Sequence, residues 1–304
     1  MKNNLILFTG LLFSFGGFIS CDKVEFPNVI ITDLDTNLYP GNFIDYDFPD
    51  FEANTNTLRN VLIEDYTGHQ CPFCPNAAED AEAIEALHPE RVFVASIHAT
   101  PSVSGTGTFQ AVNASFPRDY TNPQGKEMAS TFFQAEVGFS SNPSGNINRI
   151  PGEDGFYFFD SEFWGARTAL ALATSLSVNI QAKSTYFPET NGAYIHTETE
   201  FLTDLTGNYN MVIYALENET VSPQKMPDGS TNATYVHHDI HLGNLFGETW
   251  GRPIATGSIA SGTKVKKDFS YTLPEGLTKE EMHFLVIVFN RTTYEVMQVI
   301  KHEL

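Results

Sequence analysis

The stretch of residues 61–88 constrains the fold most, because it places two cysteines between an apolar run and a helical pattern. Val61-Leu62-Ile63 is typical of a buried strand, and a short polar turn follows at residues 67–70. From Cys71 on, small and apolar residues recur on one helical face, at Ala77, Ala81, Ile84 and Leu87. The helix should end at His88-Pro89, since the residue before a proline is pushed out of the α region.

The spacing of these cysteines predicts thiol chemistry. Cys71 should lie at the helix start, where unpaired N–H groups and the positive end of the helix dipole favour a thiolate. A partly buried contact of this kind is worth up to ~2 kcal/mol, enough to move a thiol pKa from ~8.5 to roughly 7. Cys74, one turn further on, should attack a mixed disulfide on Cys71. We therefore predict Cys71 as the nucleophile and Cys74 as the resolving thiol.

Two other interpretations of the pair stay open. A structural disulfide that closes so small a loop would stabilise by only ~2 kcal/mol, against ~4–5 kcal/mol for a long loop. A zinc half-site would need two further ligands, which His69 and His98 could supply. Because the chain has no second cysteine pair, we predict neither a metal nor another cofactor.

Residues 1–21 have the pattern of an export signal, with Lys2 followed by the apolar core Leu5–Phe18. This core is too short, and too rich in Gly and Ser, for a comfortable membrane span, although a transmembrane anchor is the alternative. Phe18-Ile19-Ser20-Cys21 resembles a bacterial lipobox, which implies that Cys21 carries lipid and becomes the mature N-terminus. The two remaining cysteines then form one pair, which fits an exported setting where dithiols cycle.

The formal net charge of −20 argues against nucleic acid and anionic lipid surfaces as partners. Residues 22–57 are rich in Asp, Asn, Thr and Pro, and they predict an acidic tether that becomes ordered towards its end. The acids in this segment do not have the spacing of a calcium loop, so we expect them to be solvated.

Residues 58–174 continue the pattern of alternating strands and helices. Arg91–His98 is a second apolar strand, which should lie parallel to the first in a right-handed βαβ unit. The further expected elements are a loop over residues 99–122, a helix over 123–136 with Met128, Phe132 and Ala135 facing inward, a strand around Gly155–Asp160, and a helix over Ser161–Thr174.

Residues 175–304 alternate in hydrophobicity instead. Short strands are predicted at residues 176–183, 193–202, 209–217, 232–241, 264–272, 282–290 and 293–300, as in an immunoglobulin-like β-sandwich. At this chain length a second domain is expected. His237-His238-x-x-His241 looks like a metal motif, but on a strand His237 and His241 share a face that His238 does not. Since no acid has matching spacing, we predict no metal here.

The strand, Cys-x-x-Cys and helix together resemble the active-site unit of the thioredoxin superfamily. This resemblance implies that Asp65, six residues before Cys71, is the buried acid that handles the proton of Cys74. It also implies that Asn142-Pro143 is the cis-proline loop, with Pro143 docking the substrate backbone. Gln70 replaces the usual Trp before the first cysteine, which is a departure from ordinary thioredoxins.

Several motifs resemble the twenty-eight-kilodalton outer-membrane lipoprotein family of Bacteroidetes. They are Glu64-Asp65-Tyr66-Thr67-Gly68, Asn142-Pro143-Ser144 with Asn148-Arg149, Tyr235-Val236-His237-His238, and Phe289-Asn290 with Tyr294-Glu295-Val296. Ser144 stands where Thr is common. The resemblance implies a lipid-anchored outer-membrane protein, on the periplasmic or cell-surface side. Members of that family are regarded as surface antigens, adhesion factors or disulfide oxidoreductases.

We therefore predict an α/β plus all-β chain. It comprises a lipoprotein signal peptide with lipidated Cys21 (1–21), an acidic tether (22–57), a thioredoxin-like domain (58–174) and an immunoglobulin-like β-sandwich (175–304). The predicted function is thiol–disulfide exchange with protein thiols or disulfides as partners, and no oligomeric state is predicted. The alternatives are a non-catalytic surface binding or adhesion lipoprotein that uses the β-sandwich, and a copper- or zinc-handling protein that uses Cys71, Cys74 and His69.

Overall fold

The computed structural model describes residues 33–100, 109–131 and 139–304. The predicted signal peptide and Cys21 lie outside these described residues, as do Phe132 and Ala135. Within the described part of the chain, no helix is both long enough and apolar enough to cross a membrane.

The predicted strand, cysteine turn, helix and strand are all present. β1 (Val61–Thr67) is buried along its whole length, α1 (Cys74–Leu87) follows the cysteine turn, and β2 (Val92–His98) runs parallel to β1. Ala77 and Ala81 are buried against both strands, as expected. Leu87 is exposed, contrary to our expectation, since the packed face of α1 reaches only to Ile84.

A third strand completes the sheet around β1. β3 (Ser144–Ile147) pairs antiparallel with β1, which gives the local order β2, β1, β3. It directly follows the peptide bond Asn142–Pro143, which is cis as the resemblance implied. The strand expected at Gly155–Asp160 is reduced to one bridge between Gly145 and Phe159, because the chain turns at Gly155, where φ is 82°.

The helices that follow agree with the sequence patterns. α2 (Pro123–Thr131) buries Met128. A short 3-10 turn, η4 (Ser161–Phe163), leads into α3 (Trp164–Leu172), whose first residue is fully buried in the core around β1 and β3.

All seven strands predicted after residue 175 are present, together with one that was missed. They are β4 (Val178–Phe187), β5 (Gly192–Phe201), β6 (Leu205–Lys225), β7 (Thr231–Asn244), β8 (Arg252–Ile259), β9 (Lys264–Thr272), β10 (Met282–Asn290) and β11 (Val296–His302). Short 3-10 turns are η1 (Thr36–Leu38), η2 (Phe43–Asp45), η5 (Leu245–Gly247) and η6 (Lys279–Glu281). β8 was missed because Pro253 and Gly257 obscure its alternation.

These strands form two packed sheets. The larger has the order β11-β10-β6-β7-β2-β1-β3, with β8 paired to β6, and the smaller has the order β4-β5-β9. Apolar side chains from both sheets fill the space between them, among them Ile195, Met211, Phe269 and Phe284. The immunoglobulin-like arrangement is not confirmed, because the larger sheet continues through β7 into the strands around β1.

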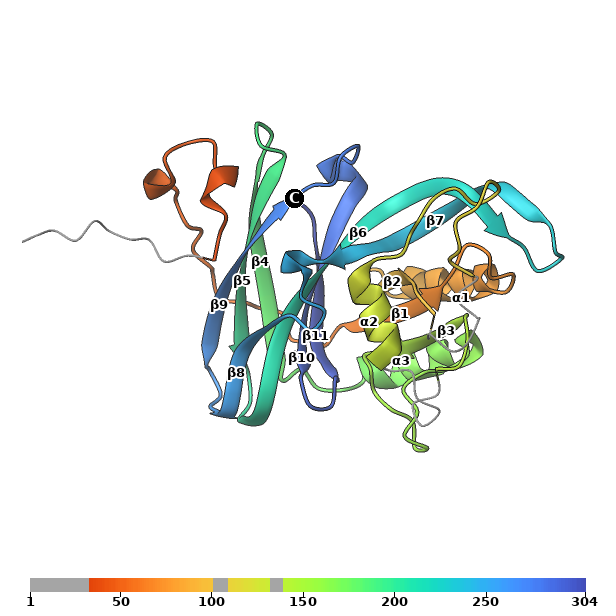
Figure 1. Ribbon diagram of the computed structural model, residues 1–304. Helices are drawn as coiled ribbons and strands as arrows, with labels where there is room; N and C mark the ends of the chain where they lie inside the picture. Colours follow the sequence, from red (N-terminus) through yellow and green to blue (C-terminus); the bar gives the residue numbers. More distant parts are fainter. Residues whose placement is uncertain (1–32, 101–108, 132–138) are drawn as a thin grey trace, which may run out of the picture. The chain divides into compact units, whose positions relative to one another are not determined.

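The β6–β7 hairpin joins the two predicted domains. Ile240 of β7 pairs in parallel with Ser96 of β2, so one sheet crosses the predicted boundary at residues 174/175. Figure 1 shows the hairpin extending from the strand-rich part towards α1. One apolar core also contains residues from both sides, including Leu62, Tyr214 and Leu285. The described elements before and after residue 174 therefore share packing as well as hydrogen bonds.

Residues 33–57, which we expected to behave as a tether ordered only towards its end, pack against the smaller sheet. Leu34 and Leu38 are buried in a cluster with Phe187 and Tyr194. The Tyr194 hydroxyl donates a hydrogen bond to the carbonyl of Asp35 at 2.7 Å. The scattered apolar residues of this acidic segment thus supply enough buried contact to order it from its first described residues.

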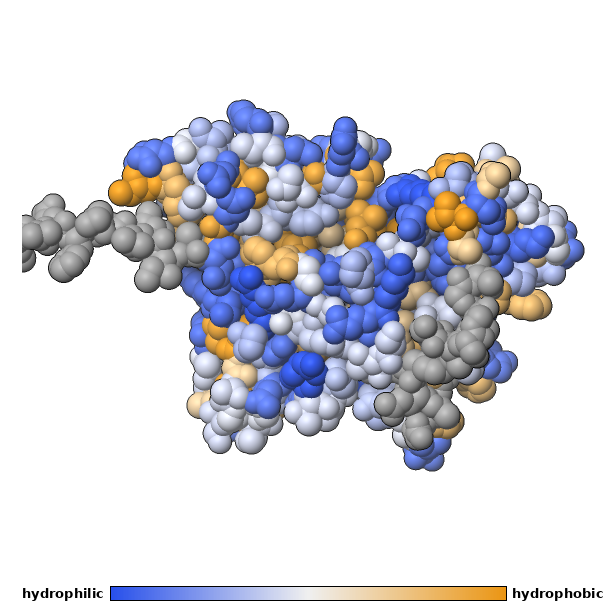
Figure 2. Space-filling model, viewed as in Figure 1, coloured by the Kyte–Doolittle hydropathy of each residue, from blue (hydrophilic) through white to orange (hydrophobic). Residues whose placement is uncertain are grey.

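The surface is mostly polar, as the net charge of −20 requires. Figure 2 shows a largely hydrophilic face on which hydrophobic residues gather in a band across the strand-rich part. The exposed apolar residues outside that part include two aromatic ones, Phe73 of the cysteine motif and Phe163. Large exposed aromatic side chains of this kind are enriched where proteins bind partners.

Candidate functional site

The two cysteines form a disulfide at the start of α1. Cys74 is the first residue of the helix, and Cys71 lies in the preceding turn, where its N–H donates to the carbonyl of Gly68 at 2.9 Å. The helix therefore begins three residues after Cys71, where we expected it to start, and Pro75 lies in its first turn. Both cysteines are buried, each 1% exposed.

The end of the β6–β7 hairpin is hydrogen-bonded to the cysteine turn. The side-chain amide of Gln224 donates to the carbonyl of Cys71 at 2.9 Å, and the backbone N–H of Lys225 donates to the carbonyl of His69 at 2.8 Å. Gln224 lies 153 residues after Cys71, and no local pattern distinguishes it from other polar strand residues. Sequence reasoning missed it for that reason.

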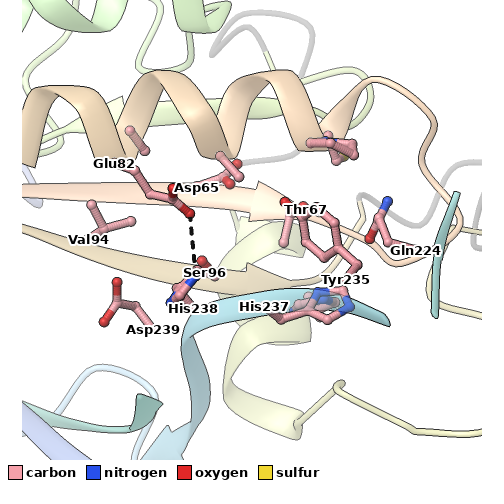
Figure 3. Close-up of a pocket in the computed structure, with 15 residues that line it drawn as sticks. Asp65, Thr67, Glu82, Val94, Ser96, Gln224, Tyr235, His237, His238 and Asp239 are labelled. Carbon is pink, nitrogen blue, oxygen red and sulfur yellow. Dashed lines mark ion pairs between the residues drawn. The ribbon is translucent and has the colours of Figure 1, made fainter. Parts of the chain in front are cut away.

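Asp65 lies on β1, and it is 1% exposed. Burial raises the pKa of its carboxyl to about 7. Among the described residues, its Oδ1 atom has no hydrogen-bond partner. Asp65 and Cys74 line the same cavity, which is shown in Figure 3. The structure thus brings together the predicted resolving thiol and the predicted proton acceptor.

Pro143 lines a different hollow, a groove of about 400 Å³. Phe73, which stands between the two cysteines, forms part of the same groove, together with Asp160 and Ser161. The side-chain amide of Asn142 holds the loop by donating to the carbonyls of Tyr66 and Ala99 at 2.7 and 2.9 Å. The groove therefore connects the predicted docking proline to the cysteine motif.

Glu64, next to Asp65 in sequence, has a full set of buried partners. The Arg149 guanidinium donates to both of its carboxyl oxygens, at 2.6 and 3.0 Å, and the hydroxyl of Tyr214 donates at 2.8 Å. Burial alone would raise the pKa of Glu64, but Arg149 holds that pKa below its ordinary value. The negative charge of Glu64 is therefore matched inside the protein.

Three histidine rings lie near the cysteine turn, where the His69 ring of that turn is 6.4 Å from that of His98, measured between centroids. His98 of β2 packs against Tyr120 with ring centroids 4.5 Å apart, and His237 of β7 lies 5.9 Å from His98. Burial lowers the pKa of His69, His98 and His237, the last to about 4, so these rings are neutral at neutral pH. Across the described residues, no group of three His, Cys, Asp or Glu side chains is arranged to hold a metal ion.

The histidines of the motif His237-His238-x-x-His241 have different partners. His237 packs against Tyr120 with ring centroids 5.1 Å apart, and His241 is buried against the side chain of Asn122. His238 instead lies 3.9 Å from Glu82 of α1. His237 and His241 therefore contact the same segment, residues 120–122, which agrees with their expected shared face.

The family model described as outer membrane protein Omp28 matches residues 130–304. No curated protein sequence matches. Among solved structures, HBP35 of Porphyromonas gingivalis is similar with a TM-score of 0.60 and 17% identity, over 83% of this chain and 77% of that one. This likeness supports a common fold.

Two further solved structures are more distant. A protein of Agrobacterium tumefaciens has a TM-score of 0.49 and 12% identity, over 82% of this chain and 96% of that one. A domain of the outer membrane lipoprotein Omp28 from Porphyromonas gingivalis has a TM-score of 0.28 and 14% identity, over 42% of this chain and 88% of that one. Neither likeness carries an argument about this site.

Proposed function

The chain belongs to the outer membrane protein Omp28 family, as its motifs predicted, and we propose that it exchanges thiols and disulfides through Cys71 and Cys74. Its place is the outer membrane, where lipid on Cys21 would hold it, and its partners would be protein thiols or disulfides. One observation carries the proposal: Cys74 shares a cavity with the buried acid Asp65, while Phe73 of the same motif shares a groove with Pro143.

The exchange would begin when a partner thiolate attacks Sγ of Cys71. The Cys71–Cys74 bond breaks, and Cys74 leaves as a thiolate that takes a proton from Asp65. The second thiol of the partner loses its proton to solvent and attacks the mixed disulfide, which forms the partner's own disulfide and releases Cys71 as a thiolate. The partner is oxidised and the cysteine pair reduced, and a second protein disulfide reverses these steps.

The surrounding charges support a reactive Cys71. Nearby carboxylates raise a thiol pKa by repulsion, but the charge of Glu64 is matched by Arg149. Asp65, with a pKa of about 7, is only partly ionised at neutral pH, which suits a group that gives and takes a proton there. Glu79 and Asp80 are exposed, so water screens their charge.

Cysteine variants of residues 22–304 test the proposal, since this piece lacks Cys21. Cys74→Ser should trap a covalent partner on Cys71, because the resolving thiol is gone. Cys71→Ser should abolish exchange with insulin or with a glutathione mixed disulfide, and the variant lacking both thiols is the matched control. Absence of a trapped partner, together with slow alkylation of reduced Cys71 at pH 7, would contradict the proposal.

The burial of both cysteines favours a second candidate function. Each cysteine is 1% exposed, so a partner must displace some of the residues that bury the disulfide before it reaches Sγ of Cys71. A chain with a permanently shielded disulfide would instead serve as a non-catalytic surface binding or adhesion protein, using its strand-rich part. The two functions differ in one measurement, because a shielded disulfide would resist dithiothreitol until the protein unfolds.

A further inference from the structure

The cavity beside Asp65 connects the cysteine motif to the histidine motif. It is lined by Asp65 of β1, Cys74 and Glu82 of α1, Ser96 of β2 and His238 of β7. The space in which the centre of a water molecule fits has a volume of about 30 Å³. A water molecule needs only ~10–15 Å³ on this measure, so the cavity has room for one or two.

Resting on the proposed exchange reaction, we propose that this cavity is the proton route of the site, in which His238, paired with Glu82, passes protons between solvent and Asp65. The route needs a buried proton-bearing group at one end, polar space in the middle and an exposed group that titrates near neutral pH at the other.

Asp65 requires such a route because it is enclosed. A carboxyl that gives its proton to Cys74 is left charged inside the cavity until a proton reaches it from outside, yet Asp65 is 1% exposed. No described residue hydrogen-bonds to its Oδ1 atom, so water in the cavity is the available partner.

The pair of His238 and Glu82 supplies the exposed end. The His238 side chain is 34% exposed and that of Glu82 is 49% exposed, with Nε2 and Oε1 3.9 Å apart. Figure 3 shows the two side chains meeting beside Asp65, one from β7 and the other from α1. From β6, the Oε1 atom of Glu219 lies 3.7 Å from the other ring nitrogen. Histidine is the side chain best suited to gain and lose a proton near neutral pH.

The other titratable groups at the cavity do not substitute for His238. Burial lowers the pKa of His98 and His237, so both rings are neutral at neutral pH and have no extra proton to pass. Asp239 is mostly buried and faces His283 of β10, 3.7 Å away.

The proton steps balance without any electron transfer along the route. Cys74 leaves as a thiolate and takes the proton of Asp65. The Asp65 carboxylate takes a proton from cavity water, which is restored by the His238 imidazolium, and His238 regains its proton from solvent. An unprotonated Cys74 thiolate would instead attack the mixed disulfide again and reverse the first step.

The test follows reduction of the Cys71–Cys74 disulfide by dithiothreitol in the folded chain at neutral pH. His238→Gln should slow the reduction by about tenfold, below the full range for a direct acid or base, because bulk water still reaches the cavity slowly. Free imidazole in the buffer should restore the rate, which a merely structural role would not explain. His88→Gln, at the end of α1 and away from the cavity, is the matched control and should change neither rate nor imidazole dependence.

The outcomes separate this inference from the proposed function. Equal rates for wild type and His238→Gln, or a slow rate that imidazole does not restore, would overturn the proton route and leave thiol exchange standing. Resistance of the folded wild type to dithiothreitol would overturn the exchange function and the route with it. Should His238→Gln fail to fold, the exposed substitution Glu82→Gln carries the same test, with a smaller slowing and the same response to imidazole.

Discussion

The Asp65→Asn variant should become more stable relative to wild type as the pH rises. The folded-state pKa of Asp65 is raised to about 7 by burial, whereas an Asp in an unfolded chain has a pKa of ~3.9. The folded state therefore holds this proton more tightly. The stability that the carboxyl contributes is fully present below pH ~4 and is lost as the pH rises through about 7. Asn keeps the shape of the side chain and cannot ionise.

The magnitude follows from the two pKa values. A difference of roughly 3 units, at ~1.4 kcal/mol per unit, gives a cost of about 4 kcal/mol for wild type well above pH 7. At pH ~5 the same carboxyl costs only ~1.5 kcal/mol, since most of the folded molecules hold the proton. The buried amide of Asn adds a cost of ~1–3 kcal/mol that does not depend on pH. Relative to wild type, the variant should therefore gain about 3 kcal/mol between pH ~5 and ~8.5.

Urea unfolding of the oxidised chain, followed by the fluorescence of buried Trp164, measures this difference at each pH. Oxidation keeps both cysteines from titrating, and Asp47→Asn at an exposed position is the control. If the stability difference between Asp65→Asn and wild type changes by less than about 1 kcal/mol over this range, Asp65 titrates as an ordinary carboxyl. Its assignment as the proton acceptor would then be wrong.

Three further predictions concern the network, the domains and the anchor. Glu64→Gln should cost about 3–5 kcal/mol in the same urea assay, because Arg149 is left buried without a counter-charge, and a loss under ~1 kcal/mol would contradict this. Residues 175–304 expressed alone should unfold without a cooperative transition, since the shared core is cut and Tyr214 loses its partners. A cooperative transition would instead support the predicted domain boundary. Cys21→Ala should abolish incorporation of a fatty-acid analogue, and unchanged labelling would exclude the lipid anchor.

Elements encoded by nearby residues could be predicted from the sequence. β1, α1 and β2 follow from an apolar run, a helical face and a second apolar run. The residues that make up each of these patterns are close together in the sequence. The strands after residue 175 follow from alternation in the same way. A family resemblance identified Asp65 as a site residue from its spacing to Cys71. That spacing does not reveal that Asp65 is buried, which only the structure shows.

What depends on distant residues could not be predicted. Gln224 reaches the cysteine turn only because the β6–β7 hairpin extends that far, and Tyr214 binds Glu64 across 150 positions of sequence. β3 is four residues long and contains Gly and Asn, so its pattern is too weak to recognise. His238 meets Glu82 of α1 only because β7 pairs with β2, a contact between strands far apart in the sequence.

The continuous sheet also sets an order of events during folding. The N–H of Asn60, just before β1, donates to the side chain of Gln298, which lies 238 residues later. Contacts of such long range form slowly, since the entropy of closing a long loop must be offset before they add stability. The loop between Cys71 and Cys74 spans three positions and needs no other part of the chain to close. During export the disulfide can therefore form early, before the strands that will enclose it have been exported and folded. The oxidation state of the pair is then set before the surrounding site has formed.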